Sequence, residues 1–273
     1  MNAREAAARV TRELVSAGIE DAAFEAEYLV RTAAGISRAQ FFARAELNDS
    51  DCARLDEIVS RRLTREPAAY IAGEREFYGL ALEVSPDVLL PRPETELLVD
   101  LAIKETASLA APVIIDVGTG SGAIAIATSL KLPGATVIGT DVSELALAVA
   151  ARNTARHGAK VQFVVADLLT PFRRADIILA NLPYIPTEEV QALEPEVRDW
   201  EPIVALDGGG DGLELVRAIV DDCAGRLRPG LLALEIGFGQ SRAVQAYCES
   251  RGAKTEIVPD LAGIERVVCA RWE

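Results

Sequence analysis

The feature of this sequence that most restricts its fold is a regular alternation of short apolar runs and helical patterns, which begins at Val113. Each run is nearly continuous in hydrophobic residues, as is typical of parallel strands buried on both faces. We expect strands at residues 113–117, 136–140, 161–165, 176–180 and 231–236. Helices between successive strands predict an α/β fold with a doubly wound sheet. Residues 254–258 and 266–271 are compatible with a final antiparallel pair.

The first 72 residues have a different character, with apolar residues at helical spacing and no strand-like run. They predict a small bundle of short amphipathic helices, in which Asp21 and Ser37 would cap the second and third helix. The bundle holds no catalytic constellation, so packing or partner binding is its natural role. We therefore expect a helical domain suited to packing or partner binding at residues 1–72, a β-hairpin and linker at 73–96, and the α/β domain at 97–273.

Charge and residue counts narrow the possible functions. A net charge of −14 argues against broad binding of nucleic acid phosphates, so no direct nucleic acid partner is expected. The four cysteines include no Cys-x-x-Cys pair, so neither a metal site nor a disulfide framework is predicted. The N-terminus lacks the apolar core of a signal peptide and no run of 18 apolar residues occurs, which favours a soluble, cytoplasmic protein. The single histidine, His157, speaks against a histidine base.

A glycine-rich turn follows the first predicted strand of this sheet. Asp116 and Val117 lead into Gly118-Thr119-Gly120-Ser121-Gly122, and glycines at such a turn let the backbone approach a ligand closely. Asp141, 25 residues after Asp116, ends the second strand, where a carboxylate can accept hydrogen bonds from both hydroxyls of a ribose. Asp167 ends the third strand, where an adenine amino group would lie.

These positions favour S-adenosyl-L-methionine as the cofactor. The glycines alone do not decide, because Gly118-x-Gly120-x-x-Ala123 also fits a dinucleotide fingerprint. The third glycine, Gly122, and the strand-end acids favour S-adenosylmethionine, and no residue is a candidate partner for hydride transfer. The other alternative is that the three acids serve only as turns or caps.

A second candidate site follows the predicted strand at 176–180. Pro183 and Pro186 lack an amide hydrogen and cannot continue a central ladder, so Asn181 to Tyr184 must lie just past the carboxyl end of that strand. In an open α/β sheet, ligands bind at this end. The segment would place a carboxamide, a backbone carbonyl and an aromatic ring there. Read without its context, it is equally compatible with a proline-rich turn and an asparagine cap.

Together these residues resemble class I methyltransferases with a Rossmann-like sheet, and four short segments narrow the resemblance. Asn181-Leu182-Pro183-Tyr184 is similar to the Asn-Pro-Pro-Tyr motif of amino and amide methyltransferases. The segments 75–78 (Arg-Glu-Phe-Tyr), 91–96 (Pro-Arg-Pro-Glu-Thr-Glu) and 234–237 (Leu-Glu-Ile-Gly) resemble those of the PrmC/HemK glutamine methyltransferases. The resemblance spans about residues 70–270, and a helical N-terminal domain fits the same family plan.

The resemblance implies methylation of the glutamine in the Gly-Gly-Gln loop of class 1 peptide chain release factors. It implies cofactor contacts from the following residues: Gly118, Thr119, Gly120, Ser121, Gly122, Asp141, Asp167, Leu168 and Asn181. The substrate would be held by Asn181, Leu182, Pro183 and Tyr184. Leu182 departs from the family, which has proline there. The family uses the backbone carbonyl of that residue, and leucine retains it, although the rigid φ of proline is lost.

The chemistry of an amide explains why such residues are needed. The lone pair of an amide nitrogen is delocalised, so the nitrogen must be polarised and aimed, and the Asn181 side-chain oxygen and the Leu182 carbonyl are the two acceptors we expect. Tyr184 would stack on the flat amide. Three alternatives stay open: a glutamine methyltransferase acting on a large-subunit ribosomal protein, a DNA adenine methyltransferase, and a non-catalytic cofactor-binding regulator. The acidic charge disfavours the DNA enzyme.

Overall fold

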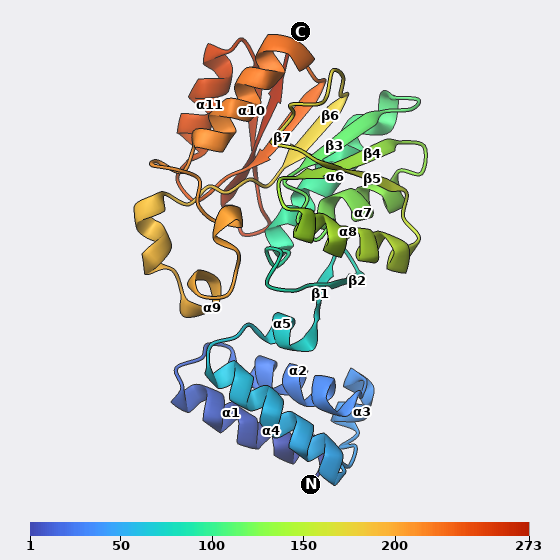
Figure 1. Cartoon of the computed structure of the whole chain (residues 1–273), viewed down its shortest axis with the longest axis vertical. Helices are drawn as coiled ribbons and strands as arrows, with labels where there is room; N and C mark the ends of the chain where they lie inside the picture. Colours follow the sequence, from blue (N-terminus) through green and yellow to red (C-terminus); the bar gives the residue numbers. More distant parts are fainter. Residues whose placement is uncertain (273) are drawn as a thin grey trace. The chain divides into compact units, whose positions relative to one another are not determined.

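Seven strands form one sheet within residues 1–272, which the computed structural model describes (Figure 1). They are β3 (Val113–Val117), β4 (Thr136–Asp141), β5 (Val161–Val165), β6 (Ile177–Ala180), β7 (Leu231–Glu235), β8 (Lys254–Pro259) and β9 (Glu265–Arg271). The order across the sheet is β5-β4-β3-β6-β7-β9-β8. β3 to β7 pair in parallel, and β9 runs antiparallel to both of its neighbours. The predicted α/β sheet and its antiparallel tail are confirmed.

Helices cover both faces of this sheet. The longer ones are α6 (Glu96–Glu105), α7 (Ala123–Lys131), α8 (Glu144–His157), α10 (Glu214–Asp222) and α11 (Ser241–Ser250). Short 3-10 turns lie at η1 (Pro93–Thr95), η2 (Thr106–Ser108), η3 (Thr187–Ala192) and η4 (Ile203–Ala205), and a π-helical turn, η5 (Cys223–Leu227), extends α10. Among the described residues, no helix has both the length and the apolar character needed to cross a bilayer.

Side chains alternate between the two faces of the sheet, as the pleat of a strand requires. Ile114 and Leu179 point into the core cluster that α6 and α7 complete, whereas Ile115 and Ile178 point into the cluster of α10 and α11. All four residues of β6 are buried, and β6 pairs with β3 on one side and β7 on the other. The residue that follows β6, Asn181, is therefore positioned at the middle of the carboxyl edge.

A β-hairpin precedes the sheet, formed by β1 (Glu74–Phe77) and β2 (Leu80–Glu83). Its two turn residues, Tyr78 and Gly79, have φ of +53° and +76°, the left-handed pair that a tight two-residue hairpin requires. Phe77, 1 % exposed, fixes the hairpin on the α6–α7 side of the core.

The N-terminal unit is a helical bundle made of α1 (Ala3–Ser16), α2 (Ala22–Ala34), α3 (Arg38–Phe42), α4 (Asp49–Leu63) and α5 (Ala68–Ala72). α2 packs against both α1 and α4 (Figure 1). Leu14, Leu29 and Leu55 are buried in the core of the bundle. Ser37 caps α3 as predicted. The predicted cap at Asp21 is wrong, because Asp21 has φ of +51° instead of the extended backbone of a cap, and its carboxylate caps no amide.

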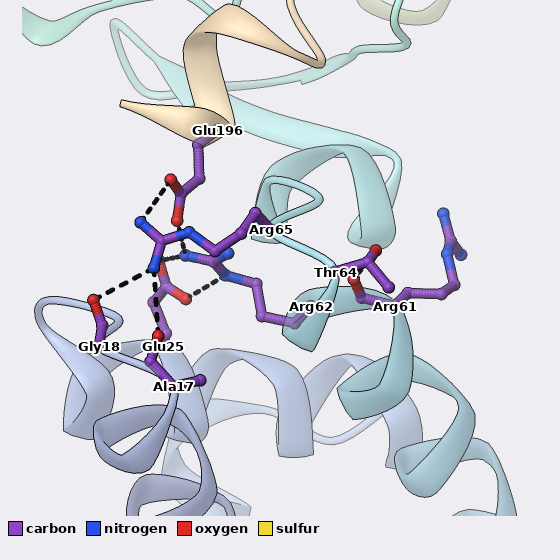
Figure 2. A network of polar contacts seen from close by, with 8 residues as sticks. All are labelled: Ala17, Gly18, Glu25, Arg61, Arg62, Thr64, Arg65 and Glu196. Carbon is purple, nitrogen blue, oxygen red and sulfur yellow. Dashed lines mark hydrogen bonds and ion pairs between the residues drawn. The ribbon is translucent and has the colours of Figure 1, made fainter. Parts of the chain in front are cut away.

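The segment Pro195–Trp200, with α9 (Pro195–Arg198), belongs to this helical unit although the residues on either side of it belong to the unit of the sheet. Glu196 holds it there (Figure 2). Arg62, whose side chain is only 3 % exposed, donates from Nη2 to Glu196 at 2.8 Å and from Nε to Glu25 at 2.6 Å. Arg65 Nη2 lies 2.8 Å from the second Glu196 oxygen. Sequence patterns alone gave no sign of this insertion.

We predict that Glu196→Ala destabilises the helical unit by about 1–3 kcal/mol, because it leaves the nearly buried Arg62 with one carboxylate instead of two. Native-state hydrogen exchange of α2 and α4 amides would measure this. Burial raises the pKa of Glu196, but the hydrogen bond from Arg62 and the other favourable contacts lower it by more, so the pKa lies below its ordinary value. The stabilisation is therefore present at neutral pH and is lost as pH falls below the ordinary carboxyl range. Glu20→Ala, at an exposed position, is the control, and equal losses in both variants would contradict the role of Glu196.

Candidate active site

A cavity of about 240 Å³ opens at the carboxyl edge of β3, β4, β5 and β6. Of the residues singled out from the sequence, its walls include Gly118, Gly120, Asp141, Asp167, Leu168, Asn181, Leu182 and Pro183. Apolar side chains complete the wall, among them Val88, Leu89, Val142 and Val204. The structure therefore brings the glycine turn, the strand-end acids and the segment after β6 to one place. Thr119, Ser121, Gly122 and Tyr184 do not line this cavity.

The glycines of the turn have separate structural roles. Gly118 has φ of +71°, and a Cβ there would lie 3.4 Å from Leu182 Cδ2 and 3.7 Å from the Asn181 carbonyl oxygen. Gly120 also has a positive φ, but a Cβ there would meet nothing within 4 Å. At Gly122 a Cβ would lie 2.9 Å from Ile126 Cδ1, so this glycine permits helix packing. The backbone at 118–120 is the part that can approach a ligand.

Asp116 holds the turn from inside the protein. It is fully buried, and its Oδ2 accepts from the Thr119 hydroxyl at 2.5 Å and from the Ala125 amide at 3.1 Å. Burial raises the pKa of Asp116 to about 7, although both hydrogen bonds act in the opposite direction. Asp116 and Thr119 therefore shape the turn from behind the cavity wall.

Asp141 lies at the cavity as the sequence predicts. Its Oδ2 accepts from the Gly120 amide at 3.0 Å and its Oδ1 from the Ser143 amide at 2.9 Å. These bonds fix the carboxylate in the wall, and each oxygen keeps a lone pair for a ligand hydroxyl. Asp167 is exposed at the same cavity, next to Leu168, whose φ is +47°.

The backbone of Pro183 and Tyr184 is fixed by the glycine-rich loop at residues 208–212. A Cβ at Gly208 would lie 2.6 Å from the Pro183 carbonyl oxygen, and one at Gly212 would lie 2.3 Å from that of Tyr184. The two segments are also hydrogen-bonded: the Ile185 carbonyl accepts from the Gly208 amide at 2.9 Å. Only glycine permits so close an approach of two backbones.

Gln240 was not predicted as a site residue, yet it joins two loops of the site. Its Nε2 donates to the Tyr184 carbonyl at 2.8 Å, and its Oε1 accepts from the Gly237 amide at 2.8 Å. Gly237 ends the segment Leu-Glu-Ile-Gly, and a Cβ there would lie 3.1 Å from Tyr184 Cδ2. Burial, followed by the charge of Glu235, raises the pKa of Tyr184, so its phenol stays neutral.

The segment Pro-Arg-Pro-Glu-Thr-Glu is fixed by a second unpredicted residue, Glu201. Its carboxylate accepts from the Leu90 amide at 3.2 Å and pairs with Arg92. Thr95, at the end of this segment, accepts from Asn181 Nδ2 at 3.1 Å. No periodicity links positions so far apart in the sequence, so only the fold could reveal these contacts.

The donor set of the cavity fits S-adenosylmethionine. A backbone turn open at Gly120, a fixed carboxylate at Asp141 and a second acid at Asp167 match the amino acid, ribose and adenine parts of that molecule, and apolar walls suit its adenine ring. The lone His157, at the end of α8, takes no part, because its Nε2 lies 2.8 Å from the carbonyl oxygen of Ala81 on β2. With the sheet topology, this site defines an S-adenosylmethionine-dependent methyltransferase of class I.

Comparison with known proteins gives the family. The chain is 41% identical to a release factor glutamine methyltransferase of Geobacter sulfurreducens, over 94% of this chain and 92% of that protein. It is also 41% identical to a release factor glutamine methyltransferase of Cereibacter sphaeroides, over 99% of both. The family model "PrmC N-terminal domain" matches residues 5–73, and "Ribosomal protein L11 methyltransferase (PrmA)" matches residues 95–197. The chain belongs to the release factor glutamine methyltransferase family.

Solved structures agree on the fold. A methyltransferase from Pyrococcus furiosus superposes with a TM-score of 0.52 at 17% identity, covering 71% of this chain and 89% of that one. The T. thermophilus 16S rRNA N2 G1207 methyltransferase, solved with AdoMet and guanosine, gives 0.51 at 20% identity, over 73% of this chain and 50% of that one. The fold class, the enzyme class and the cofactor expected from the sequence are thus confirmed. The roles of single residues stay predictions.

We predict that Asp141→Ala weakens S-adenosylmethionine binding at least about tenfold, because it removes the fixed acceptor for a ribose hydroxyl, a charge-assisted bond of roughly 1.5 kcal/mol or more. Calorimetry on the folded variant measures the affinity. Glu144→Ala removes an exposed carboxylate from the first turn of α8, outside the cavity wall, and is the matched control. Unchanged affinity in Asp141→Ala would remove this residue from the cofactor site.

Proposed function

We propose that this protein transfers a methyl group from S-adenosylmethionine to the side-chain amide nitrogen of the glutamine in the Gly-Gly-Gln motif of class 1 peptide chain release factors. The observation that carries the proposal is the Asn181–Leu182 pair. It stands at the middle of the carboxyl edge, at the same cavity as Gly118 and Asp141. The names of the relatives and the match to the PrmC N-terminal domain support the same substrate.

The cofactor would be held by the residues of the cavity wall. Gly118 and Gly120 offer their backbone, Asp141 would accept from the ribose hydroxyls, and Asp167 with Leu168 would border the adenine. Thr119, Ser121 and Gly122 would contribute indirectly, by giving the turn its shape. When bound, S-adenosylmethionine supplies a methyl group made electrophilic by its sulfonium.

The task of the protein is to orient the amide nitrogen and to increase its electron density. The Asn181 Oδ1 and the Leu182 carbonyl would each accept one of the two amide hydrogens, and within the described chain no hydrogen bond from another residue reaches either atom. Held in this way, the nitrogen lone pair can be aimed at the methyl carbon from about 3–3.5 Å. The nitrogen gains a bond to carbon, the carbon–sulfur bond breaks, and the surplus proton passes to water.

Leu182 also has a packing role that proline would not fill. It is 4 % exposed and lies in the core cluster of α10 and α11. Its Cδ2 is the atom that a Cβ at Gly118 would approach most closely, at 3.4 Å. Leucine therefore fixes this part of the loop by side-chain packing, where the family proline would do so through its restricted φ. The carbonyl that would meet the substrate is present in both cases.

Tyr184 would stack on the amide of the substrate glutamine, and Pro183 would shape the approach to it. The Tyr184 ring is half-buried and its backbone is fixed by Gln240 and Gly212, so its position is set before a substrate arrives. Such a ring excludes water from one side of a flat amide at little entropic cost.

The helical unit, residues 1–72, would recognise the body of the release factor, because it holds no catalytic constellation. Residues 73–96 would be a hairpin and linker, and residues 97–273 the catalytic domain. The charge of −14 suits a protein partner with a basic surface better than nucleic acid, and the reaction would take place in the cytoplasm.

A direct assay compares three purified substrates with labelled cofactor: a release factor, large-subunit ribosomal protein and DNA. The proposal predicts label in the Gly-Gly-Gln glutamine of the release factor, located by mass spectrometry. Preferential label in ribosomal protein or in DNA would contradict it.

We predict that Asn181→Ala lowers the single-turnover rate on a release factor by ~30- to 1000-fold, because an acceptor positioned in a water-excluded site is worth roughly 2–4 kcal/mol. Leu182→Pro keeps the carbonyl, so its rate should stay within about tenfold. Glu188→Ala, exposed on η3, is the control. If Asn181→Ala keeps its rate while Leu182→Pro loses it, the assignment of the two acceptors is wrong.

A further inference from the structure

The side-chain amide of Asn181 is hydrogen-bonded to a buried threonine. Asn181 Nδ2 donates to Thr95 Oγ1 at 3.1 Å, and Thr95 is only 4 % exposed. Thr95 ends η1 and immediately precedes α6, so both its backbone and its surroundings are fixed. With the nitrogen of the amide directed to Thr95, the oxygen is directed to the other side.

A buried carboxylate, that of Glu235, is a second neighbour of the Thr95 hydroxyl. Glu235 ends β7, is 2 % exposed, and its Oε2 has no hydrogen-bond partner among the described residues. The Thr95 hydroxyl interacts with this carboxylate in the sense that favours its ionised form. An ionised carboxylate can only accept, so this interaction draws the Thr95 proton toward Glu235. Toward Asn181 the hydroxyl accepts from Nδ2, which leaves Oδ1 directed away from Thr95.

We propose that Thr95 is a positioning residue that keeps the Asn181 amide in the one orientation that presents its oxygen to the substrate. This inference rests on the proposed function, in which Oδ1 must accept a hydrogen from the substrate amide. The opposite orientation would direct the Asn181 NH₂ group at the NH₂ group of the substrate, two donors with no acceptor between them.

The protonation of Glu235 should therefore affect the rate. A protonated Glu235 can donate to Thr95, whose own proton is then free to pair with Asn181 Oδ1 and turn the amide. Burial raises the pKa of Glu235 to about 7; Arg266 on β9 and Arg92 before η1 lower it, Glu94 on η1 raises it, and the Tyr184 phenol lies nearby. The ionised form is the active one, so the rate should rise as pH increases through about 7. A substrate amide does not titrate in this range.

The first test compares Thr95→Val with Thr95→Ser in single-turnover methylation of a release factor. Valine has the shape of threonine but cannot accept from Asn181, so we expect a rate about 10- to 100-fold lower, with the KM for the release factor and the affinity for S-adenosylmethionine nearly unchanged. Serine keeps the hydroxyl and should stay within about threefold of the wild type. If Thr95→Val does not fold well, Thr95→Ala tests the same loss of the hydroxyl with a smaller side chain.

Two further measurements separate positioning from a general structural effect. In an Asn181→Ala background, Thr95→Val should cause no additional loss, because there is no amide left to orient. Glu235→Gln, which does not titrate, should flatten the rise in rate near pH 7. If the rise persists in Glu235→Gln, it belongs to another group, for which buried Asp116 is the candidate, and Glu235 has no part in it.

The outcomes distinguish this role from the proposed function. A wild-type protein that does not methylate the release factor overturns the proposed function and this role with it. An active wild type with full rate in Thr95→Val, or an additive loss in the double variant, overturns the role of Thr95 alone.

Discussion

The site depends on one constraint: the chain leaves the centre of the sheet at Asn181 and must be held there without strand pairing. β6 is buried and paired on both sides, but Pro183 and Pro186 prevent its ladder from continuing. The loop is fixed instead by backbone packing at Gly208 and Gly212 and by the side chain of Gln240. A segment held in this way keeps the Leu182 carbonyl and the Asn181 side-chain oxygen available for a ligand, where a strand would have used its carbonyls.

The same constraint brings the glycine turn after β3 next to the loop after β6. Gly118 approaches Leu182 and the Asn181 carbonyl so closely that the cofactor turn and the substrate loop share one wall. A methyl donor bound at the glycine turn and an amide bound at Asn181 and Leu182 are then both placed by rigid elements, which is what a reaction without acid or base catalysis requires. Asp116 and Thr119, which stay behind the wall, maintain the turn.

The parts of the fold that follow local rules could be predicted from the sequence. The boundaries of β3 and β5 match the apolar runs, and Ser37 caps α3 by accepting from the Gln40 amide. The strand-end acid Asp141 lies at the cavity because parallel strands end at a common edge. Asp21 was misjudged because residue type alone does not show a left-handed backbone. The contacts of Gln240, Glu201 and Thr95 join residues far apart in the chain, so no local sequence pattern predicts them. The placement of Glu196 in the helical unit depends on a tertiary ion pair with Arg62 and could not be predicted for the same reason.

The central claim is that the substrate amide nitrogen is held between the Asn181 side-chain oxygen and the Leu182 carbonyl. A crystal structure with the demethylated cofactor product and a Gly-Gly-Gln peptide tests this directly. We expect the glutamine amide nitrogen at about 3 Å from both oxygen atoms, with Asn181 Nδ2 still hydrogen-bonded to Thr95. A glutamine side chain bound elsewhere, or an Asn181 amide that presents its nitrogen to the substrate, would contradict the claim.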